Sequence, residues 1–353
     1  MGAYDLSRLG ALIVEDNDYI RQTLENLLFH FQFGRIATAS HGEEAVEYLK
    51  SLTSSSSDIA PPDMIFSDLV MSPVNGLLLL RWIRSSKESP NRMTPFIMLS
   101  GAADEDYVHS ARDLGTTDFM AKPFSAAIVY NHIAKVIENP RQFVTTTNYF
   151  GPDRRRRKKV EVTQERRVKN DKDVTIVYSQ EKVVKPKTAT DVWYFRLPNA
   201  LKEKVGGGLV GPAEIPKDLL NEAEEQMERG ADDFSVWAME YVKELSELCK
   251  KALEDEEGIG RAKIFSEMNL LALELRGQGG TFGYPLITTF GKMLYDTTVE
   301  GCSEDNIAVE VVKSHVDAMR AVLREKVDGD GGEVGRALLA SLQLAIEKAE
   351  SAT

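Results

Sequence analysis

Five short apolar segments alternate with amphipathic stretches over residues 10 to 138, and this alternation constrains the fold more than any other feature of the chain. Each segment has the length of a strand, and the stretches between them place apolar residues at helical spacing. Strands that alternate with helices form a parallel sheet covered on both faces. We therefore predict a doubly wound α/β domain whose five-stranded parallel sheet contains ALIVE (11–15), RIATAS (35–40), DMIFSD (63–68), PFIMLS (95–100) and DFMAKP (118–123).

The rest of the chain has a different character. Residues 141–200 hold 15 Lys and Arg against 7 Asp and Glu, although the whole chain has a net charge of -12. This asymmetry and several turn-rich stretches predict a basic, partly extended linker over 141–212, in which DVTIVYS (173–179) has the composition of a strand. A domain boundary is therefore expected near residue 140, and a second one near residue 212.

Residues 213–353 carry helical periodicity throughout. One apolar stripe runs along residues 234–249, and further helices are expected at about 259–276, 284–298, 304–325 and 333–351. These helices predict a C-terminal all-α bundle.

Acidic side chains stand where two of the predicted strands end. Glu15 and Asp16 follow the first strand and Asp68 follows the third. Because the carboxyl ends of parallel strands meet at one edge of a sheet, these carboxylates should converge and repel one another unless a cation lies between them. Mg²⁺ fits best, because it takes few protein ligands and keeps several waters. Ser100 and Lys122 end the fourth and fifth strands, and their hydroxyl and ammonium groups would complete a site for a phosphoryl group.

The segments LIVEDN, FSDLVMSPVNG, MLSG and FMAKPF, in this order, resemble the four signatures of a CheY-like response regulator receiver domain, which has a flavodoxin-like fold. The resemblance implies that Asp68 accepts a phosphoryl group from a histidine kinase or a histidine phosphotransfer protein. It implies that Asp16, Asp68 and the backbone carbonyl of Val70 bind Mg²⁺, and that Glu15 holds a metal-bound water.

The same resemblance implies roles for three further residues. Ser100 and Lys122 would contact the phosphoryl group, and Phe119 would change rotamer on activation, although an aromatic residue at this place is also often simply part of a core. The family often has proline four residues after the phosphoacceptor, whereas this chain has Ser72 there, followed by Pro73. This departure affects the expected shape of the turn more than the chemistry.

The stretch LALELRGQGGTFGYPL (271–286) resembles a histidine phosphotransfer domain without its histidine. Leu273 occupies the place of the phosphorylated residue, while Arg276 and Gly277 keep the basic and small neighbours that such a helix needs. Leucine cannot accept phosphate, so we expect a bundle that is inactive as a relay. The bundle's one histidine, His315, shares an apolar stripe and is predicted to be a packed core residue.

Leu270 and Leu273 fall outside the core stripe of their helix on a helical wheel. With Arg276 they form a candidate docking patch, and the alternative is that another helix covers them.

These features together predict a response regulator that acts through protein contacts of its bundle. The expected partners are a histidine kinase or phosphotransfer protein, an output protein and a second copy of the chain, but neither nucleic acid nor a membrane. We expect a cytoplasmic location because no segment has the roughly 18 apolar residues of a membrane span. Two alternatives stay open: a transcription regulator that binds DNA through residues 150–170, and a phosphatase that acts on a partner phosphoprotein.

Overall fold

The computed structural model divides into two compact units, residues 1–120 with 126–223 and residues 121–125 with 224–353. It describes residues 4–53, 59–101, 105–154, 175–178, 186, 188, 191–206, 217–229, 231–255 and 260–351. In this described part of the chain, no helix is long and apolar enough to cross a bilayer.

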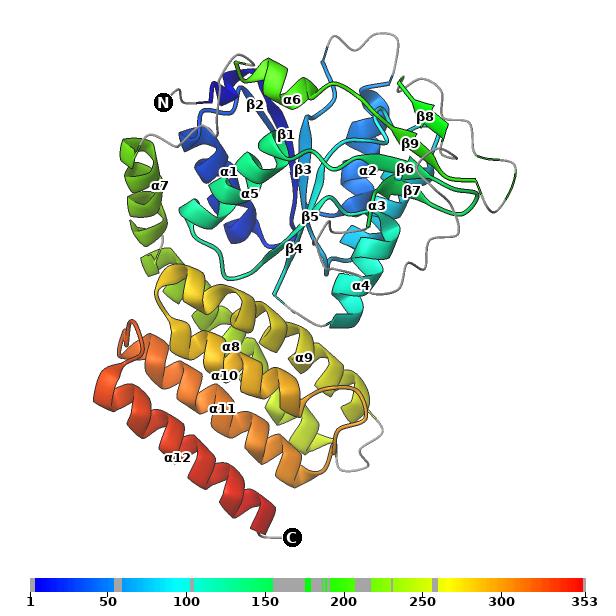
Figure 1. Ribbon diagram of the computed structural model, residues 1–353. Helices are drawn as coiled ribbons and strands as arrows, with labels where there is room; N and C mark the ends of the chain where they lie inside the picture. The colour runs from blue at the N-terminus through cyan, green and yellow to red at the C-terminus, as the bar shows by residue number, and fades with distance from the viewer. Residues whose placement is uncertain are drawn as a thin grey trace, which may run out of the picture. The chain divides into compact units, whose positions relative to one another are not determined.

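A five-stranded parallel sheet forms the centre of the first unit, as predicted (Figure 1). Strand β1 pairs in parallel with β2 and with β3, and β3 pairs in parallel with β4. The strand order is β2-β1-β3-β4-β5. The strands are β1 (Gly10–Val14), β2 (Arg35–Ala39), β3 (Met64–Asp68), β4 (Phe96–Ser100) and β5 (Asp118–Ala121).

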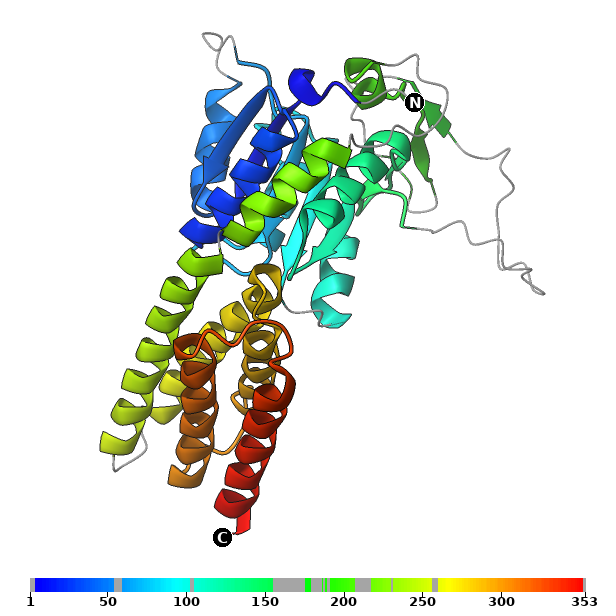
Figure 2. The same cartoon turned by 90° about the vertical axis from the view of Figure 1, so that its left-hand side faces the viewer.

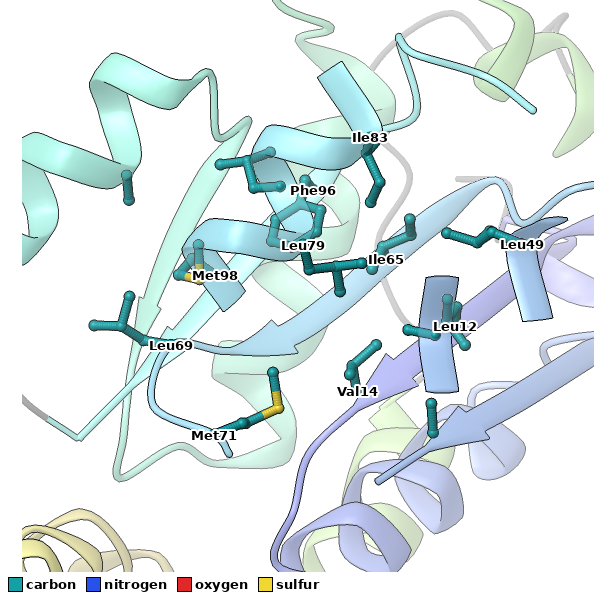
Figure 3. Packing of buried hydrophobic residues seen from close by; sticks show 14 of the residues in the cluster. Leu12, Val14, Leu49, Ile65, Leu69, Met71, Leu79, Ile83, Phe96 and Met98 are labelled. Atoms are coloured by element: carbon teal, nitrogen blue, oxygen red, sulfur yellow. The ribbon is translucent and has the colours of Figure 1, made fainter. Parts of the chain in front are cut away.

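Helices α1 and α5 lie on one face of this sheet, and α2, α3 and α4 lie on the other (Figure 1). Side chains of β1, β3 and β4 meet those of α2 and α3 in the main hydrophobic core, where Ile65, Leu79 and Phe96 point toward one another (Figure 3). The continuous burial of β1, β3 and β4 explains why each of these strands is mainly apolar, with polar residues only at the ends of β3 (Ser67 and Asp68) and β4 (Ser100). The helices are α1 (Asp18–His30), α2 (Gly42–Ser51), α3 (Gly76–Ser85), α4 (Glu105–Leu114) and α5 (Ala126–Glu138), preceded by a short 3-10 turn η1 (Leu6–Arg8).

A second, four-stranded sheet follows the receiver-like sheet in sequence, with the order β7-β6-β9-β8. The segment expected to be a linker thus contributes folded structure to the first unit, although residues 155–174 lie outside the described residues. The strand expected within 173–179 is present as β8, whereas the other three strands were not predicted. The elements are β6 (Phe143–Thr145), β7 (Phe150–Pro152), β8 (Thr175–Val177), β9 (Trp193–Phe195) and the short helix α6 (Ala200–Lys204).

The second unit is helical, as predicted. Its helices run side by side in Figure 2, where they are coloured from yellow-green to red, and α9 packs against both α8 and α10. Gly291 permits the α9–α10 contact, because a Cβ atom there would lie 2.6 Å from the backbone nitrogen of Arg276. The helices of the second unit are α8 (Ala231–Glu254), α9 (Arg261–Gln278), α10 (Pro285–Thr297), α11 (Asn306–Arg324) and α12 (Gly332–Ser351), with a 3-10 turn η3 (Gly279–Phe282). Helix α7 (Lys217–Arg229) spans the boundary between the two units.

Candidate functional site

Three carboxylates meet at the carboxyl edge of the main sheet. One oxygen from each of Glu15, Asp16 and Asp68 lies within 4.8 Å of the others. The parallel register of β1 and β3, in which Val14 pairs with Ser67, brings the residues that follow these two positions side by side. Glu15 and Asp68 are buried while Asp16 is exposed, so the site is open to solvent on one side.

Backbone groups fix the position of Asp68. Its side chain is 3% exposed, and its Oδ1 accepts a hydrogen bond from the backbone nitrogen of Leu69 at 2.7 Å. The turn after β3 folds back closely, because the backbone nitrogen of Gly76 donates to the carbonyl oxygen of Leu69 at 3.1 Å. A Cβ atom on Gly76 would lie 2.1 Å from the carbonyl oxygen of Asp68, so glycine is required where α3 begins.

Two neighbouring residues support the site and were not predicted from the sequence. Asn17 directly follows Asp16, and its Oδ1 caps α1 by accepting a hydrogen bond from the backbone nitrogen of Ile20 at 3.1 Å. Asn75 caps α3 in the same way through the backbone nitrogen of Leu78 at 3.0 Å. An asparagine just before a helix is a readable capping signal, so both could have been found.

The predicted hydroxyl and ammonium groups belong to the same edge of the sheet. Ser100 is the last residue of β4 and Lys122 directly follows β5, and both are buried. Because β3, β4 and β5 are neighbours in the sheet, Asp68, Ser100 and Lys122 are attached to three consecutive strands. The half-buried Phe119 packs against the main core, and the half-buried Val70 does the same.

The donor set fits a hard divalent cation. Carboxylate oxygens are the protein ligands that Mg²⁺ takes, at about 2.1 Å, and water completes its octahedral shell. Three carboxylate oxygens within 4.8 Å of one another match such an ion, and their mutual repulsion gives the cation a stabilising role.

In the second unit, the prediction of an exposed docking patch is wrong for Leu273. Leu270 is 53% exposed as expected, but Leu273 is only 8% exposed. A helical wheel treats every turn of a helix alike, whereas burial changes along α9 and includes Gly277 and Gln278 at its C-terminal end. Arg276 is half-buried, with its guanidinium carbon 5.3 Å from the centre of the Tyr295 ring.

The prediction of a packed histidine is confirmed. His315 is 0% exposed, and its Nδ1 lies 2.8 Å from the carbonyl oxygen of Val311. Burial lowers the pKa of His315, and the hydrogen bond to Val311 offsets this effect only in part. A neutral imidazole buried in the second unit has no access to a phosphoryl donor.

The five-stranded parallel sheet and the acidic triad agree with a response regulator receiver domain in the N-terminal part of the chain. Residues 11–134 match the response regulator receiver domain family.

Parts of the chain are similar to individual curated proteins and to a solved structure. The chain is 29% identical over 126 residues to the chemotaxis protein CheY of Bacillus subtilis, covering 36% of this chain and 95% of CheY. It is 28% identical over 137 residues to the 3',5'-cyclic-nucleotide phosphodiesterase regA of Dictyostelium discoideum, covering 38% of this chain but only 16% of the phosphodiesterase. The solved structure of the chemotaxis protein CheY4 of Vibrio cholerae aligns with 36% of this chain and 98% of CheY4, at 23% identity and a TM-score of 0.32.

Proposed function

We propose that Asp68 accepts a phosphoryl group from a histidine kinase or a histidine phosphotransfer protein, and that Mg²⁺ assists this transfer. The observation that carries the proposal is the convergence of Glu15, Asp16 and Asp68, with one oxygen of each within 4.8 Å of the others. Asp16, Asp68 and the backbone carbonyl of Val70 would hold the metal ion, and Glu15 would hold a metal-bound water.

Each side chain of the site has a chemical task in this proposal. An Asp68 carboxylate oxygen attacks phosphorus while the bond from phosphorus to the imidazole nitrogen of the donor breaks, so an acyl phosphate forms. The electron pair of the broken bond stays on that nitrogen, and because the other ring nitrogen of the donor carries a proton, neutral imidazole departs. Mg²⁺ held by Asp16, Asp68 and the carbonyl of Val70 would supply positive charge to the phosphoryl oxygens. The Lys122 ammonium neutralises a further oxygen, and the Ser100 hydroxyl donates a hydrogen bond to another. Ser100 would move when it bonds to the phosphoryl group, and Phe119 would then change rotamer.

For the second unit we propose a protein-interaction output built on a phosphotransfer-like bundle that has lost its histidine. Leu273 at the critical position cannot form a phosphoramidate, and burial of His315 makes it a poor substitute. The output partner, the second copy of the chain and the cytoplasmic location remain predictions. DNA binding through residues 150–170 is a weaker candidate, because no helix-turn-helix spacing or zinc pattern accompanies these basic residues and the whole chain is acidic.

A phosphorylation assay tests the proposal. Full-length protein is incubated with Mg²⁺ and acetyl phosphate carrying a radioactive phosphoryl group, together with Asp68→Ala and, as a matched control, the exposed-site variant Asp113→Ala. We expect one label in the wild type and in the control, none in Asp68→Ala, and complete loss of label in hydroxylamine, which cleaves acyl phosphates.

Chelation of Mg²⁺ before the donor is added should prevent labelling of the wild type as effectively as the Asp68 substitution does. Equal labelling of wild type and Asp68→Ala would show that the proposal is wrong. Label that resists hydroxylamine and alkali would indicate a phosphohistidine and would require a new interpretation of the bundle.

A further inference from the structure

A cavity of about 870 Å³ lies in the first unit at the sheet edge opposite to Asp68. Asp63, Pro95 and Thr117 line it, and they immediately precede β3, β4 and β5. Asp68 and Ser100 end two of these strands, and a five-residue strand is about 17 Å long. The cavity is therefore distinct from the phosphoacceptor site.

The small sheet and α6 build the other wall of this cavity. Phe143, Phe150 and Phe195 line it, and the rings of Phe143 and Phe195 each lie with their centres 5.7 Å from that of Phe150. Because these rings pack on one another, the apolar wall is preformed. Small-molecule sites in proteins are typically apolar cavities of about 300–1,000 Å³ with a few polar groups, and this cavity fits that description.

Basic side chains dominate the charged part of the lining. Among the described residues, Arg92, Arg141, Arg196 and Lys204 line the cavity, and Asp63 contributes the single carboxylate. Asp63 is already engaged, because Lys204 Nζ lies 2.5 Å from its Oδ1. The remaining charge facing the cavity is therefore positive.

Several donors at the cavity have no acceptor within the described part of the chain. Arg196 is exposed, and its guanidinium makes no hydrogen bond or ion pair there. Arg92 uses Nε to donate to the carbonyl oxygen of Arg84 at 2.6 Å and stacks 4.2 Å from the centre of the Phe150 ring, which leaves its terminal nitrogens available. The buried Oγ of Ser89 also has no partner. An anion would supply the acceptors that these groups lack.

A further buried cation lies beside this cavity. Arg84 is 3% exposed, and its guanidinium donates to the carbonyl oxygens of Arg92, Thr94 and Gly115 at 2.8 to 3.0 Å, while its Nη2 has no partner. Its guanidinium carbon lies 5.2 Å from the centre of the Phe143 ring, which lines the cavity. Burial lowers the pKa of Arg84 to about 9, so the group keeps its charge at neutral pH. A buried charge without a carboxylate partner attracts an anion strongly, because the surrounding dielectric is low.

We propose that this cavity binds an organic anion, whose apolar body contacts the phenylalanine wall and whose charged group faces Arg92 and Arg196. A cation would meet uncompensated positive charge there, and a neutral ligand would leave the guanidinium donors unpaired. This site is independent of the phosphorylation of Asp68.

Matched ligands of one shape test the charge requirement. The dissociation constants of naphthalene-2-carboxylate and its neutral analogue naphthalene-2-carboxamide are measured with full-length protein by titration calorimetry. We expect the carboxylate to bind at least about tenfold more tightly than the carboxamide, since a charged hydrogen bond stabilises more than a neutral one. Absence of saturable carboxylate binding, or equal affinity of the two ligands, would overturn the proposal.

Matched variants test the location. Arg196→Ala should weaken carboxylate binding by about three- to tenfold, a moderate loss because the side chain is exposed. Arg81→Ala removes an exposed arginine of α3 that does not line the cavity, and it should leave the affinity unchanged. Equal losses in the two variants would contradict the assignment. A folded Asp63→Asn variant should bind the carboxylate more tightly, because it removes the one carboxylate of the described lining, and weaker binding would count against the site.

Discussion

Arg154 donates from Nη1 to Asp113 Oδ1 at 2.8 Å and so ties the segment that follows the receiver fold to the C-terminal end of α4. The guanidinium carbon of Arg154 also lies 4.6 Å from the centre of the Tyr149 ring. The Tyr149 hydroxyl in turn donates to the carbonyl oxygen of Pro152 at 2.7 Å. The turn around β7 is therefore fixed to the receiver by side chains as well as by its sheet.

Close backbone contact should contribute more to this attachment than the ion pair does. A Cβ atom on Gly151 would lie 2.6 Å from the Tyr149 hydroxyl oxygen and 2.9 Å from the Cα atom of Gly115. We expect Gly151→Ala to lower the free energy of unfolding of the first unit by about 1–3 kcal/mol, as overpacking does. Urea unfolding followed through tryptophan fluorescence measures this change.

The comparison variant is Arg154→Gln. Both partners of its ion pair are about half exposed, so its removal should cost less than about 1 kcal/mol. A larger loss in Arg154→Gln than in Gly151→Ala would mean that charge, not backbone proximity, holds this segment in place.

Asp118 should give the receiver a stability that disappears in acid. Burial alone would raise the pKa of Asp118, but hydrogen bonds from His132 and Lys135 outweigh it and hold the pKa below its usual value of 3.8. His132 Nδ1 and Lys135 Nζ each lie 2.7 Å from a carboxylate oxygen of Asp118. A carboxylate whose pKa is depressed by folding stabilises the folded state above its unfolded pKa and ceases to do so as the pH falls through its folded pKa.

The expected result is that Asp118→Asn lowers the free energy of unfolding at pH 7 by on the order of 1 kcal/mol. The difference from the wild type should shrink as the pH falls below 3.8, which denaturant unfolding between pH 2.5 and 7 would reveal. Glu25→Gln, at an exposed position of α1, should show no such convergence. A pH-independent difference for Asp118→Asn would count against the depressed pKa.

His315 should make the bundle sensitive to mild acid. Burial lowers the pKa of His315 in the folded bundle. Below about pH 6.5 the imidazole is therefore protonated in the unfolded chain but not to the same extent in the folded bundle. Stability should be constant above that pH and decrease below it, by up to about 1.4 kcal/mol per pH unit. His315→Leu should abolish this dependence while retaining a buried side chain. Amide hydrogen exchange in α11, compared between pH 5 and 8, measures it, and identical pH profiles for the two proteins would exclude the effect.

Replacing Gly291 by alanine tests how closely α9 and α10 approach each other, because close packing and an open helix predict changes in stability of opposite sign. In an open helix, replacing glycine by alanine stabilises the helix by about 0.5–1 kcal/mol. In α10 the added Cβ would lie 2.6 Å from the backbone nitrogen of Arg276 and 3.0 Å from its Cα atom. We therefore expect Gly291→Ala to destabilise the bundle by about 1–3 kcal/mol.

The control for this prediction is Thr289→Ala, at an exposed position of the same helix, which loses one side-chain hydrogen bond to a backbone carbonyl. Its effect should stay within about 1 kcal/mol. Thermal unfolding measures both variants, and a more stable Gly291→Ala would show that α9 and α10 do not approach this closely.

The sequence predicts the main sheet to within a residue or two at each strand, because β1, β3 and β4 are buried on both faces and are therefore mainly apolar. It also predicts the carboxylate cluster, because strand ends are visible as the point where apolar residues give way to Glu15, Asp16 and Asp68. Neither prediction needs knowledge of side-chain packing.

The second sheet was missed for an equally physical reason. Strands of three residues, such as Phe143–Thr145 and Trp193–Phe195, are too short to show an alternating pattern. They are specified by contacts between distant aromatic residues, for example Phe150 with Phe195, which one-dimensional periodicity does not record. The error at Leu273 has the same origin, because burial at the end of α9 depends on three-dimensional surroundings.

The rings of Phe143 and Phe150, which lie over the guanidinium groups of Arg84 and Arg92, extend the smallest part of the first unit that is expected to fold alone. The sheet and its helices end at Glu138, but Phe143, Phe150 and Phe195, which pack with Met93, come later in sequence. Asn199 then returns to bond the carbonyl oxygen of Ile137 at 2.6 Å, and the carbonyl oxygen of Val205 accepts from the backbone nitrogen of Asp5 at 3.2 Å. A chain that ended at residue 140 would lack the aromatic rings that pack on Arg84 and Arg92. We therefore expect a receiver fragment that folds alone to extend to Val205.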